Sequence, residues 1–272
     1  MLKPSARTNE IIQYCLALAS KQTDVQIHVV CFMSNHWHGV VSDPSARLPE
    51  FLERFHRLVA RAQNASLGRW ENLWSSEKPS IVRLVSDEDI LQKMAYTLAN
   101  PTAAGLVPSP SGWPGVITTR LMERRRVAMP SVFFNPNGEL PDSVVLETTR
   151  PPIYPQLSLA ELGSRLHDVV QRLVRSAQQA LAKAGKRFVG ASAVLQRSFH
   201  DRPDTVELHR NSNPRIAARH TTERVEAFRR LKAFVREYRS AWQAWRHGHR
   251  EQVFPAGTYA LRVQAGVICR PP

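Results

Sequence analysis

The residues that decide the fold are Val25-Gln-Ile-His-Val-Val-Cys-Phe-Met33, then Ser34-Asn35, then His36-Trp-His-Gly-Val-Val-Ser42. The first stretch is rich in β-branched and apolar residues, and the last alternates between side-chain types, which is typical of strands. The Ser-Asn pair between them favours a turn. We therefore expect residues 25–42 to form a β-hairpin.

Helical spacing of apolar residues predicts a helix before the hairpin and others after it. These helices cover residues 8–22, 49–67 and 86–100, and a short strand covers residues 80–85. This order predicts an α+β fold with helices on one face of a largely antiparallel sheet.

The ends of two of these helices have recognisable signals. Thr8 or Asn9 can cap the first helix. Ser86 and the acidic turn after it can cap the third, which we expect to stop near Asn100, because Pro101 disfavours a helical residue before it.

The second half of the chain differs in composition. Residues 108–155 are rich in proline and resemble an irregular connection, whereas residues 158–184 and 221–247 have helical patterns. We expect a domain over residues 1–118, a connection over 119–155 and a helical region over 156–272.

The basic residues are unevenly distributed. The formal net charge is +14; residues 1–150 hold 16 basic and 14 acidic side chains (net +2), and residues 151–272 hold 21 and 9 (net +12). Such a basic half favours contact with a polyanion, usually nucleic acid. Codon bias is the open alternative, because 30 of the 37 basic residues are arginine.

Several classes of protein are disfavoured. The sequence has neither an apolar run of the roughly 20 residues that a membrane span needs nor an apolar segment at its start. Its cysteines are Cys15, Cys31 and Cys269, an odd number without zinc-type spacing. We expect a cytoplasmic protein with reduced thiols and no membrane partner. Cys31 is expected to be a core residue.

His36-Trp37-His38 is the sharpest local motif. Side chains two residues apart on a strand share a face, so both imidazoles can bind one ion while Trp37 packs on the other face. Mg²⁺ or Mn²⁺ would also need oxygen ligands. A purely structural role for the pair stays open.

A second set of polar residues lies near the end of the third helix. Tyr96 and Asn100 are four residues apart and share a face, and Lys93 lies one turn earlier. Asn100 offers a carbonyl oxygen to an ion, Tyr96 a hydroxyl that can attack phosphorus, and Lys93 a positive charge. The alternative is that Tyr96 packs and Asn100 merely precedes the helix end.

Together the two motifs resemble one family. Cys31-Phe-Met-Ser-Asn-His-Trp-His-Gly-Val-Val41 is similar to the HUH strand of single-tyrosine transposases, and Ala95-Tyr-Thr-Leu-Ala-Asn-Pro-Thr-Ala-Ala-Gly-Leu-Val107 to their tyrosine helix. The resemblance is closest to the REP-associated tyrosine transposases of bacteria. It covers about residues 8–118.

The resemblance implies a ferredoxin-like sheet and a function. His36, His38 and Asn100 would bind Mg²⁺ or Mn²⁺, and Tyr96, assisted by Lys93, would be the nucleophile. The enzyme would cleave and rejoin single-stranded or hairpin DNA of the inverted-repeat type through a 5′-phosphotyrosine. Such an enzyme works at the bacterial nucleoid, and a homodimer is compatible with the family.

One departure from the family concerns the sheet. The family's sheet opens with a central strand before the first helix, whereas only residues 1–7 precede it here, with Pro4 among them. Three explanations stay open: an upstream start, a sheet completed in another way, including by a partner chain, or a decayed copy.

Arginines on two predicted helices are our candidates for DNA contact, because guanidinium groups bind phosphate. They are Arg54, Arg57, Arg61, Arg69, Arg229, Arg230, Arg236, Arg239, Arg246 and Arg250, with Lys232 among them. The neighbouring aromatic residues follow an apolar stripe, which favours core packing over base stacking. Arg124-Arg125-Arg126 is expected in a loop. His28 and His56 are not expected to bind metal, and His56 is placed on the basic helix face.

Two other functions remain open. A non-catalytic nucleic-acid-binding relative would bind DNA with a steep salt dependence but form no covalent adduct. A metal-dependent hydrolase that activates water would keep its activity without the Tyr96 hydroxyl.

Overall fold

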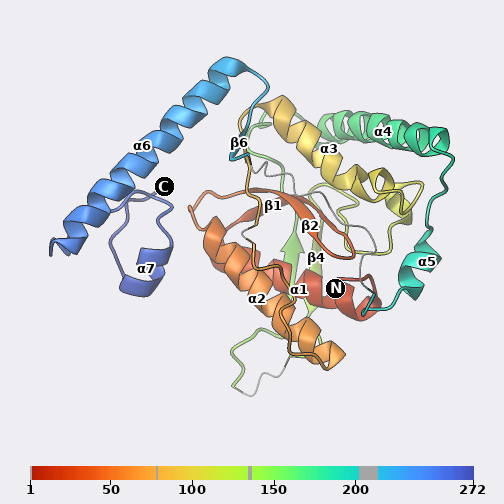
Figure 1. Cartoon of the computed structure of the whole chain (residues 1–272), viewed down its shortest axis with the longest axis horizontal. Helices are drawn as coiled ribbons and strands as arrows, with labels where there is room; N and C mark the ends of the chain where they lie inside the picture. Colours follow the sequence, from red (N-terminus) through yellow and green to blue (C-terminus); the bar gives the residue numbers. More distant parts are fainter. Residues whose placement is uncertain (1, 78, 134–136, 202–213) are drawn as a thin grey trace.

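The computed structural model describes residues 2–77, 79–133, 137–201 and 214–272 (Figure 1). Its helices are α1 (Ala6–Thr23), α2 (Leu48–Leu67), α3 (Asp87–Ala103), α4 (Leu159–Lys183), α5 (Ala191–Gln196), α6 (Thr221–Arg246) and α7 (Ala260–Ala265), with a 3₁₀ turn over Pro110–Gly112. Its strands are β1 (Gln26–Phe32), β2 (Trp37–Ser42), β3 (Arg83–Leu84), β4 (Arg124–Ala128), β5 (Ser143–Glu147) and β6 (Ile216–Ala217). The prediction of an α+β fold is confirmed.

The central hairpin forms as expected. β1 and β2 are antiparallel, with Cys31 opposite His38 and Phe32 opposite Trp37. The register shifts between Ile27 and Val29, so a bulge interrupts the ladder there. His36 thus lies directly before β2, next to the turn, and His38 is the second residue of β2.

Helices cover both faces of this hairpin, and not one face as the sequence suggested. Ile27, Val30 and Phe32 join a core with α1 and α2, whereas Val29 and Val40 join a core with α3 and α4. In Figure 1 the hairpin accordingly lies between α3 and the α1–α2 pair. The reason is in β1, whose residues after Gln26 are all buried, so both of its faces need apolar partners.

The second edge of β1 is bonded by a segment from much later in the chain. The amide of Phe32 donates to the carbonyl oxygen of Val116 over 2.8 Å, and the amide of Thr118 donates to Val30 over 2.9 Å. The amide of Thr149 donates to Ile27 over 2.7 Å. These bonds satisfy the second edge of β1 with residues of the same chain. The sheet is thus completed in another way, which was one of the three explanations for the absence of a strand before α1.

Gly115 allows the connection to approach this edge. The Trp113 indole donates to the carbonyl oxygen of Phe32 over 2.9 Å. A Cβ on Gly115 would lie 2.9 Å from the same oxygen and 2.5 Å from the indole nitrogen. A larger residue at position 115 would therefore push the connection away from β1.

The ends of two helices differ from the expectation. Ser5, and not Thr8 or Asn9, caps α1, and its hydroxyl accepts from the amide of Thr8 over 3.0 Å. Ser86 caps α3 as predicted, but α3 continues through Pro101 to Ala103. Pro101 removes one donor from the last turn, but the amides of residues 104 and 106 still bond to the carbonyls of Asn100 and Pro101.

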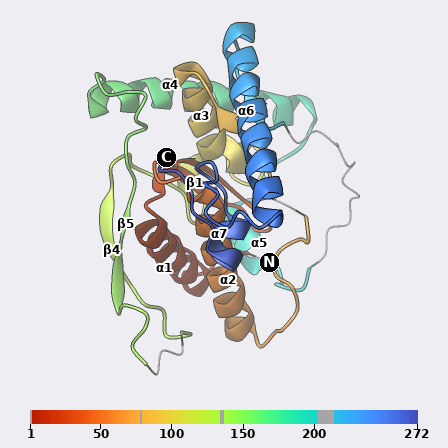
Figure 2. The same cartoon turned by 90° about the vertical axis from the view of Figure 1, so that its left-hand side faces the viewer.

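The connection expected over residues 119–155 is not irregular. It contains the antiparallel pair of β4 and β5, which packs against α1 (Figure 2). Arg124, Arg125 and Arg126 lie on β4 and not in a loop. The period-two pattern of Val144 and Leu146, which are buried in the α1 core, stabilises this hairpin.

The boundary at residue 156 also changes. α4 packs along α3, with Leu166, Val170 and Val174 in the shared core, so it belongs to the first domain. The strand expected over residues 80–85 is shorter in the structure, where only β3 forms, and β3 pairs in parallel with β6. After β6 the chain forms α6, α7 and the segments around them.

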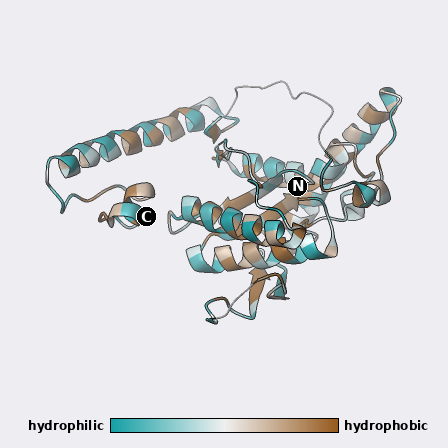
Figure 3. Ribbon diagram, turned by 60° about the horizontal axis from the view of Figure 1, so that its bottom comes forward, coloured by the Kyte–Doolittle hydropathy of each residue, from teal (hydrophilic) through white to brown (hydrophobic). Residues whose placement is uncertain are grey.

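α6 and α7 are joined by their own small core. Ala241, Phe254 and Val267 are buried there, with Tyr238 and Trp245 packed against them. Figure 3 shows hydrophobic and hydrophilic segments alternating along α6. No helix in the described residues is both long and apolar enough to cross a membrane.

Candidate active site

The two motif histidines lie side by side at the start of β2. Their Nε2 atoms are 3.0 Å apart, and their rings are nearly perpendicular. His36 is exposed and His38 half-buried. The strand period therefore brings both imidazoles to one point, as the sequence predicted.

Asn100 reaches the same point from α3. Its amide Nδ2 lies 3.1 Å from Nε2 of His38, and the residue is 7% exposed. Rotating the carboxamide by half a turn exchanges the positions of Nδ2 and Oδ1, so Oδ1 can face Nε2 of His38 instead. The packing of α3 on the hairpin thus joins residues that are 62 positions apart.

Tyr96 stands beside this cluster, one turn before Asn100. Its ring centroid is 5.5 Å from that of His38, and the residue is 45% exposed. Lys93 places its Nζ 5.3 Å from the centroid of the Tyr96 ring. The phenol is therefore accessible to a large substrate, with a cation next to it.

The opposite face of β2 is held by aromatic packing. Trp37 stacks on Phe32 with ring centroids 5.4 Å apart and meets Phe55 edge to face. Its indole donates to Nε2 of His56 over 3.1 Å, and the indole of Trp74 donates to the carbonyl of His56 over 2.8 Å. His56 thus supports the strand from inside, and its expected place on the basic face of the helix is wrong.

The environment favours the neutral form of His38. Burial, with His36 and Lys93 nearby, lowers the pKa of His38 from 6.5 to about 4. A neutral imidazole keeps a lone pair, which a metal ligand requires. The ring is therefore able to bind a cation at neutral pH.

The residues present fit a divalent ion. Adjacent ligand atoms around an octahedral ion with bonds of about 2.1 Å are separated by about 3.0 Å. The Nε2 atoms of His36 and His38 have this separation, and Asn100 lies 3.1 Å from the second. No group of three His, Cys, Asp or Glu side chains gathers in the part of the chain that the structure describes. The Asn100 carboxamide is the third side chain whose oxygen could reach an ion beside the two imidazoles.

Sequence reasoning missed the part played by Asn35. Its Oδ1 lies 2.7 Å from Nδ1 of His36, so that nitrogen can donate to it and Nε2 is left facing His38. The available signal was its place directly before His36, where its residue type indicates only a turn.

The other predicted residues lie outside this cluster. His28 bonds to Thr149 and Ser42, and Cys31 is buried with its pKa raised to about 12 by burial, so both are core groups as expected. On and beside α2, Arg54, Arg57 and Arg69 form ion pairs with Glu50, Glu53 and Glu71, whereas Arg61 forms none within the described residues.

The arginines predicted on the last helix fall into three groups, and Arg250 lies beyond the end of α6. Arg230 pairs with Glu226, while Arg246 and Arg250 lie over the rings of Trp242 and Trp245. Arg229 is exposed, and Arg236 and Arg239 line a groove with Lys232. None of these residues belongs to the histidine–tyrosine cluster.

Compared with known proteins, the chain matches no family model, no curated protein and no solved structure at a significant level.

Proposed function

We propose that the protein is a metal-dependent DNA strand transferase of the single-tyrosine type, cutting and rejoining single-stranded or hairpin DNA. The observation that supports this most strongly is the convergence of four side chains from two elements. His38 comes from β2 and His36 from the residue directly before it, and Asn100 and Tyr96 come from one face of α3, with all four side chains close together.

His36, His38 and Asn100 would hold Mg²⁺ or Mn²⁺. The bound ion would polarise the scissile phosphate and offset charge on its oxygens. Lys93, 5.3 Å from the Tyr96 ring centroid, adds a positive charge beside the phenol. It would attract the phosphate.

Tyr96 is the nucleophile of the proposed reaction. Its Oη forms a bond to phosphorus while the bond from phosphorus to the 3′ oxygen breaks. The phenol loses its proton and the 3′ oxygen gains one, giving a 5′-phosphotyrosine and a free 3′-hydroxyl. Rejoining reverses the step with another 3′-hydroxyl, and the ester conserves the energy of the broken bond.

The test is a covalent adduct on a denaturing gel. Full-length protein is mixed with labelled single-stranded DNA that carries a hairpin, with Mg²⁺, Mn²⁺ or EDTA. We expect an adduct with either metal and none with EDTA. Tyr96→Phe should abolish it, whereas Tyr259→Phe, at another partly exposed tyrosine, should not.

Other outcomes separate the alternatives. DNA binding that falls steeply with salt, with no adduct under any metal, indicates a non-catalytic binding protein. Metal-dependent cleavage that persists in Tyr96→Phe but not in His38→Ala indicates a hydrolase. Either result would reject the tyrosine mechanism.

A further inference from the structure

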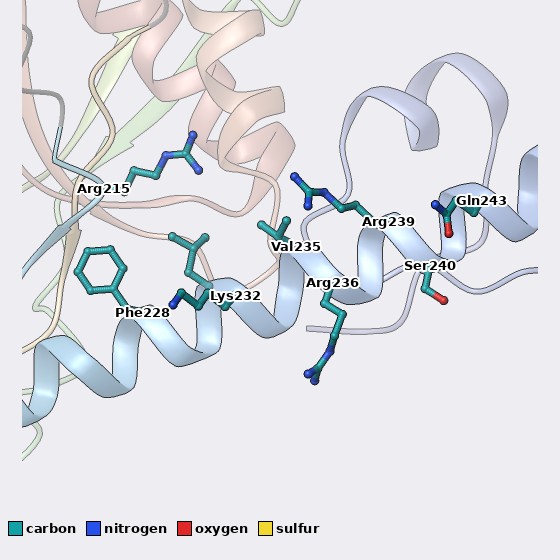
Figure 4. Close-up of a pocket in the computed structure, with 9 residues that line it drawn as sticks. Arg215, Phe228, Lys232, Val235, Arg236, Arg239, Ser240 and Gln243 are labelled. Atoms are coloured by element: carbon teal, nitrogen blue, oxygen red, sulfur yellow. The ribbon is translucent and has the colours of Figure 1, made fainter.

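A groove runs along one face of α6, away from the histidines. It has a volume of about 680 Å³. Its lining repeats at three- and four-residue steps, so it follows one face of the helix, with Arg215 from the chain before β6 near its Phe228 end (Figure 4). The lining residues are Arg215, Phe228, Leu231, Lys232, Val235, Arg236, Arg239, Ser240 and Gln243. We call it the α6 groove.

The floor of the α6 groove is apolar and open. Phe228 is 43% exposed, and Leu231 and Val235 are only partly covered. This differs from the other side of α6, where Tyr238 and Trp245 pack on the buried Phe254 and Val267. The sequence predicted that the aromatics Tyr238, Trp242 and Trp245 pack in the core. This holds for Tyr238 and Trp245 but not for Trp242, which is 37% exposed. Phe228 presents its ring to the groove.

The rim of the α6 groove is cationic. Arg215, Lys232, Arg236 and Arg239 are all exposed, and none of the described residues that line the groove is acidic. None of the four forms an ion pair within the described residues, whereas Arg230 and Arg270 on or near α6 are paired with Glu226 and Glu237. Among the described residues, the groove therefore concentrates positive charge without a paired carboxylate.

This combination points to one class of ligand. We propose that the α6 groove binds a short unpaired segment of a nucleic-acid strand, with a base against Phe228 and phosphates on Lys232, Arg236 and Arg239. Cations along a groove and an exposed ring on its floor are the two features that unpaired strands need, because every base has a face that can stack. The net charge of +12 over residues 151–272 supports a polyanion in preference to an ordinary peptide.

The dimensions of the rim agree with a strand of a few nucleotides. Lys232 and Arg239 are seven residues apart on α6, which corresponds to about 10 Å along a helix. That length corresponds to the axial rise of about three nucleotides in a stacked strand, at about 3.4 Å each along the strand axis.

The inference deepens the proposed function, on which it rests for the class of substrate. The α6 groove and the histidine–tyrosine cluster share no residue. A strand held in the groove would therefore be bound apart from the site of cleavage. Loss of groove binding would lower the affinity for DNA without removing the nucleophile.

The first experiment measures binding of a fluorescent twelve-nucleotide oligothymidylate by anisotropy, over a range of salt concentrations. All variants carry Tyr96→Phe, so binding is read without chemistry. We expect Phe228→Ala to weaken binding roughly tenfold with an unchanged salt slope, because it removes stacking and not charge. Lys232→Gln with Arg236→Gln should weaken binding at least tenfold and reduce the slope by about 0.7 for each phosphate that the protein no longer neutralises.

A matched control separates the groove from overall charge. Arg172→Gln with Arg224→Gln removes two exposed arginines that do not line the groove, one on α4 and one on α6. We expect binding within about twofold of the parent protein. An equal loss in this control would reject a specific groove, as would unchanged binding in both groove variants. Unchanged circular dichroism melting curves verify that the variants fold.

A second measurement locates the base directly. An oligothymidylate with one 5-iododeoxyuridine is crosslinked to the protein by light and the attached peptide is identified by mass spectrometry. The proposal requires a crosslink in the peptide that contains Phe228. A crosslink confined to other peptides would overturn it, as would tighter groove-dependent binding of an acidic, leucine-containing peptide than of the oligothymidylate.

The two proposals can fail independently. A covalent adduct with unaffected oligothymidylate binding in the groove variants would reject the groove and leave the chemistry standing. Groove-dependent binding without any adduct would reject the chemistry and leave the groove.

Discussion

The indole of Trp37 donates to Nε2 of His56 over 3.1 Å, on the face of β2 opposite to His36 and His38. This bond requires a neutral His56. Burial lowers the pKa of His56 from 6.5 to about 4. His56 therefore supports β2 from the side opposite to the motif histidines. Its ring stays neutral to a lower pH in the folded protein than in the unfolded chain.

A first prediction concerns acid stability. Because the pKa of His56 is lower in the folded state, its contribution to the unfolding free energy is complete above about pH 6.5 and is lost as the pH falls towards 4. His56→Gln retains a hydrogen-bond acceptor but does not titrate. We expect this variant to show a shallower fall in unfolding free energy between pH 6.5 and 4, measured by urea denaturation. If the unfolding free energy falls equally with pH in the variant and in the parent protein, this role of His56 is contradicted.

The second prediction concerns Asn35 as a positioning residue. Its Oδ1, 2.7 Å from Nδ1 of His36, directs Nε2 of that ring towards His38. Asn35→Ala should weaken Mn²⁺ binding about tenfold, measured by titration calorimetry, because outer-shell partners orient metal ligands. Asn35→Asp, which keeps an acceptor, should restore it. Equal loss in both variants would assign Asn35 a role in the turn alone.

The third prediction concerns the approach of residues 113–118 to β1. Gly115→Ala puts a Cβ 2.9 Å from the carbonyl oxygen of Phe32. We expect a loss of about 1–3 kcal/mol in unfolding free energy, because backbone atoms must shift. Gly163→Ala is the control: its Cβ would meet no atom within 4 Å in α4, so it should be neutral or stabilising by up to about 1 kcal/mol. A thermal melt of each variant distinguishes the two effects.

The fourth prediction concerns the attachment of α7 to α2. Glu50 lies 3.0 Å from Arg262, and it also pairs with Arg47 and Arg54. Hydrogen bonds from Arg47 and Arg54 lower the pKa of Glu50 to about 2, so this stabilisation is present above about pH 4.5 and is lost as the pH falls towards 2.

Glu50→Gln leaves the half-buried guanidinium groups without their carboxylate. We expect a loss of about 2–4 kcal/mol at pH 7 and faster hydrogen exchange in α7. Glu53→Gln, which removes an exposed carboxylate paired with Arg57, should change stability by less than about 1 kcal/mol. If exchange in α7 is the same in both variants, Arg262 does not anchor it.

Local patterns were sufficient for several features. The apolar run of β1, the alternation in β2 and the helical spacing in α2, α4 and α6 act over a few residues, so these elements were predicted within a few positions. The sharing of a face by Tyr96 and Asn100 is likewise a property of a single helix. The motif histidines converge because a strand repeats every two residues.

Features that depend on distant partners were not predicted. The strands β4 and β5 were not predicted, because the surrounding residues are rich in proline. They form because Val144 and Leu146 pack against the apolar face of α1. His56 appears on a basic helix in the sequence, but it lies between Trp37 and Trp74 once α2 packs on β2. The α6 groove needs Arg215 from the chain before β6, which no spacing on α6 could indicate.

The sequence by itself determined the hairpin, the main helices, the basic second half and the identity of the residues that could carry chemistry, because these follow from backbone periodicity and side-chain type. Only the tertiary structure decided that Asn100 meets His38 across 62 positions, that residues 116–118 and 148–149 bond to β1, and that Phe228 stays exposed while Tyr238 is packed. Each of these features depends on which apolar surfaces pack against each other. That packing depends on the whole chain and not on a local pattern.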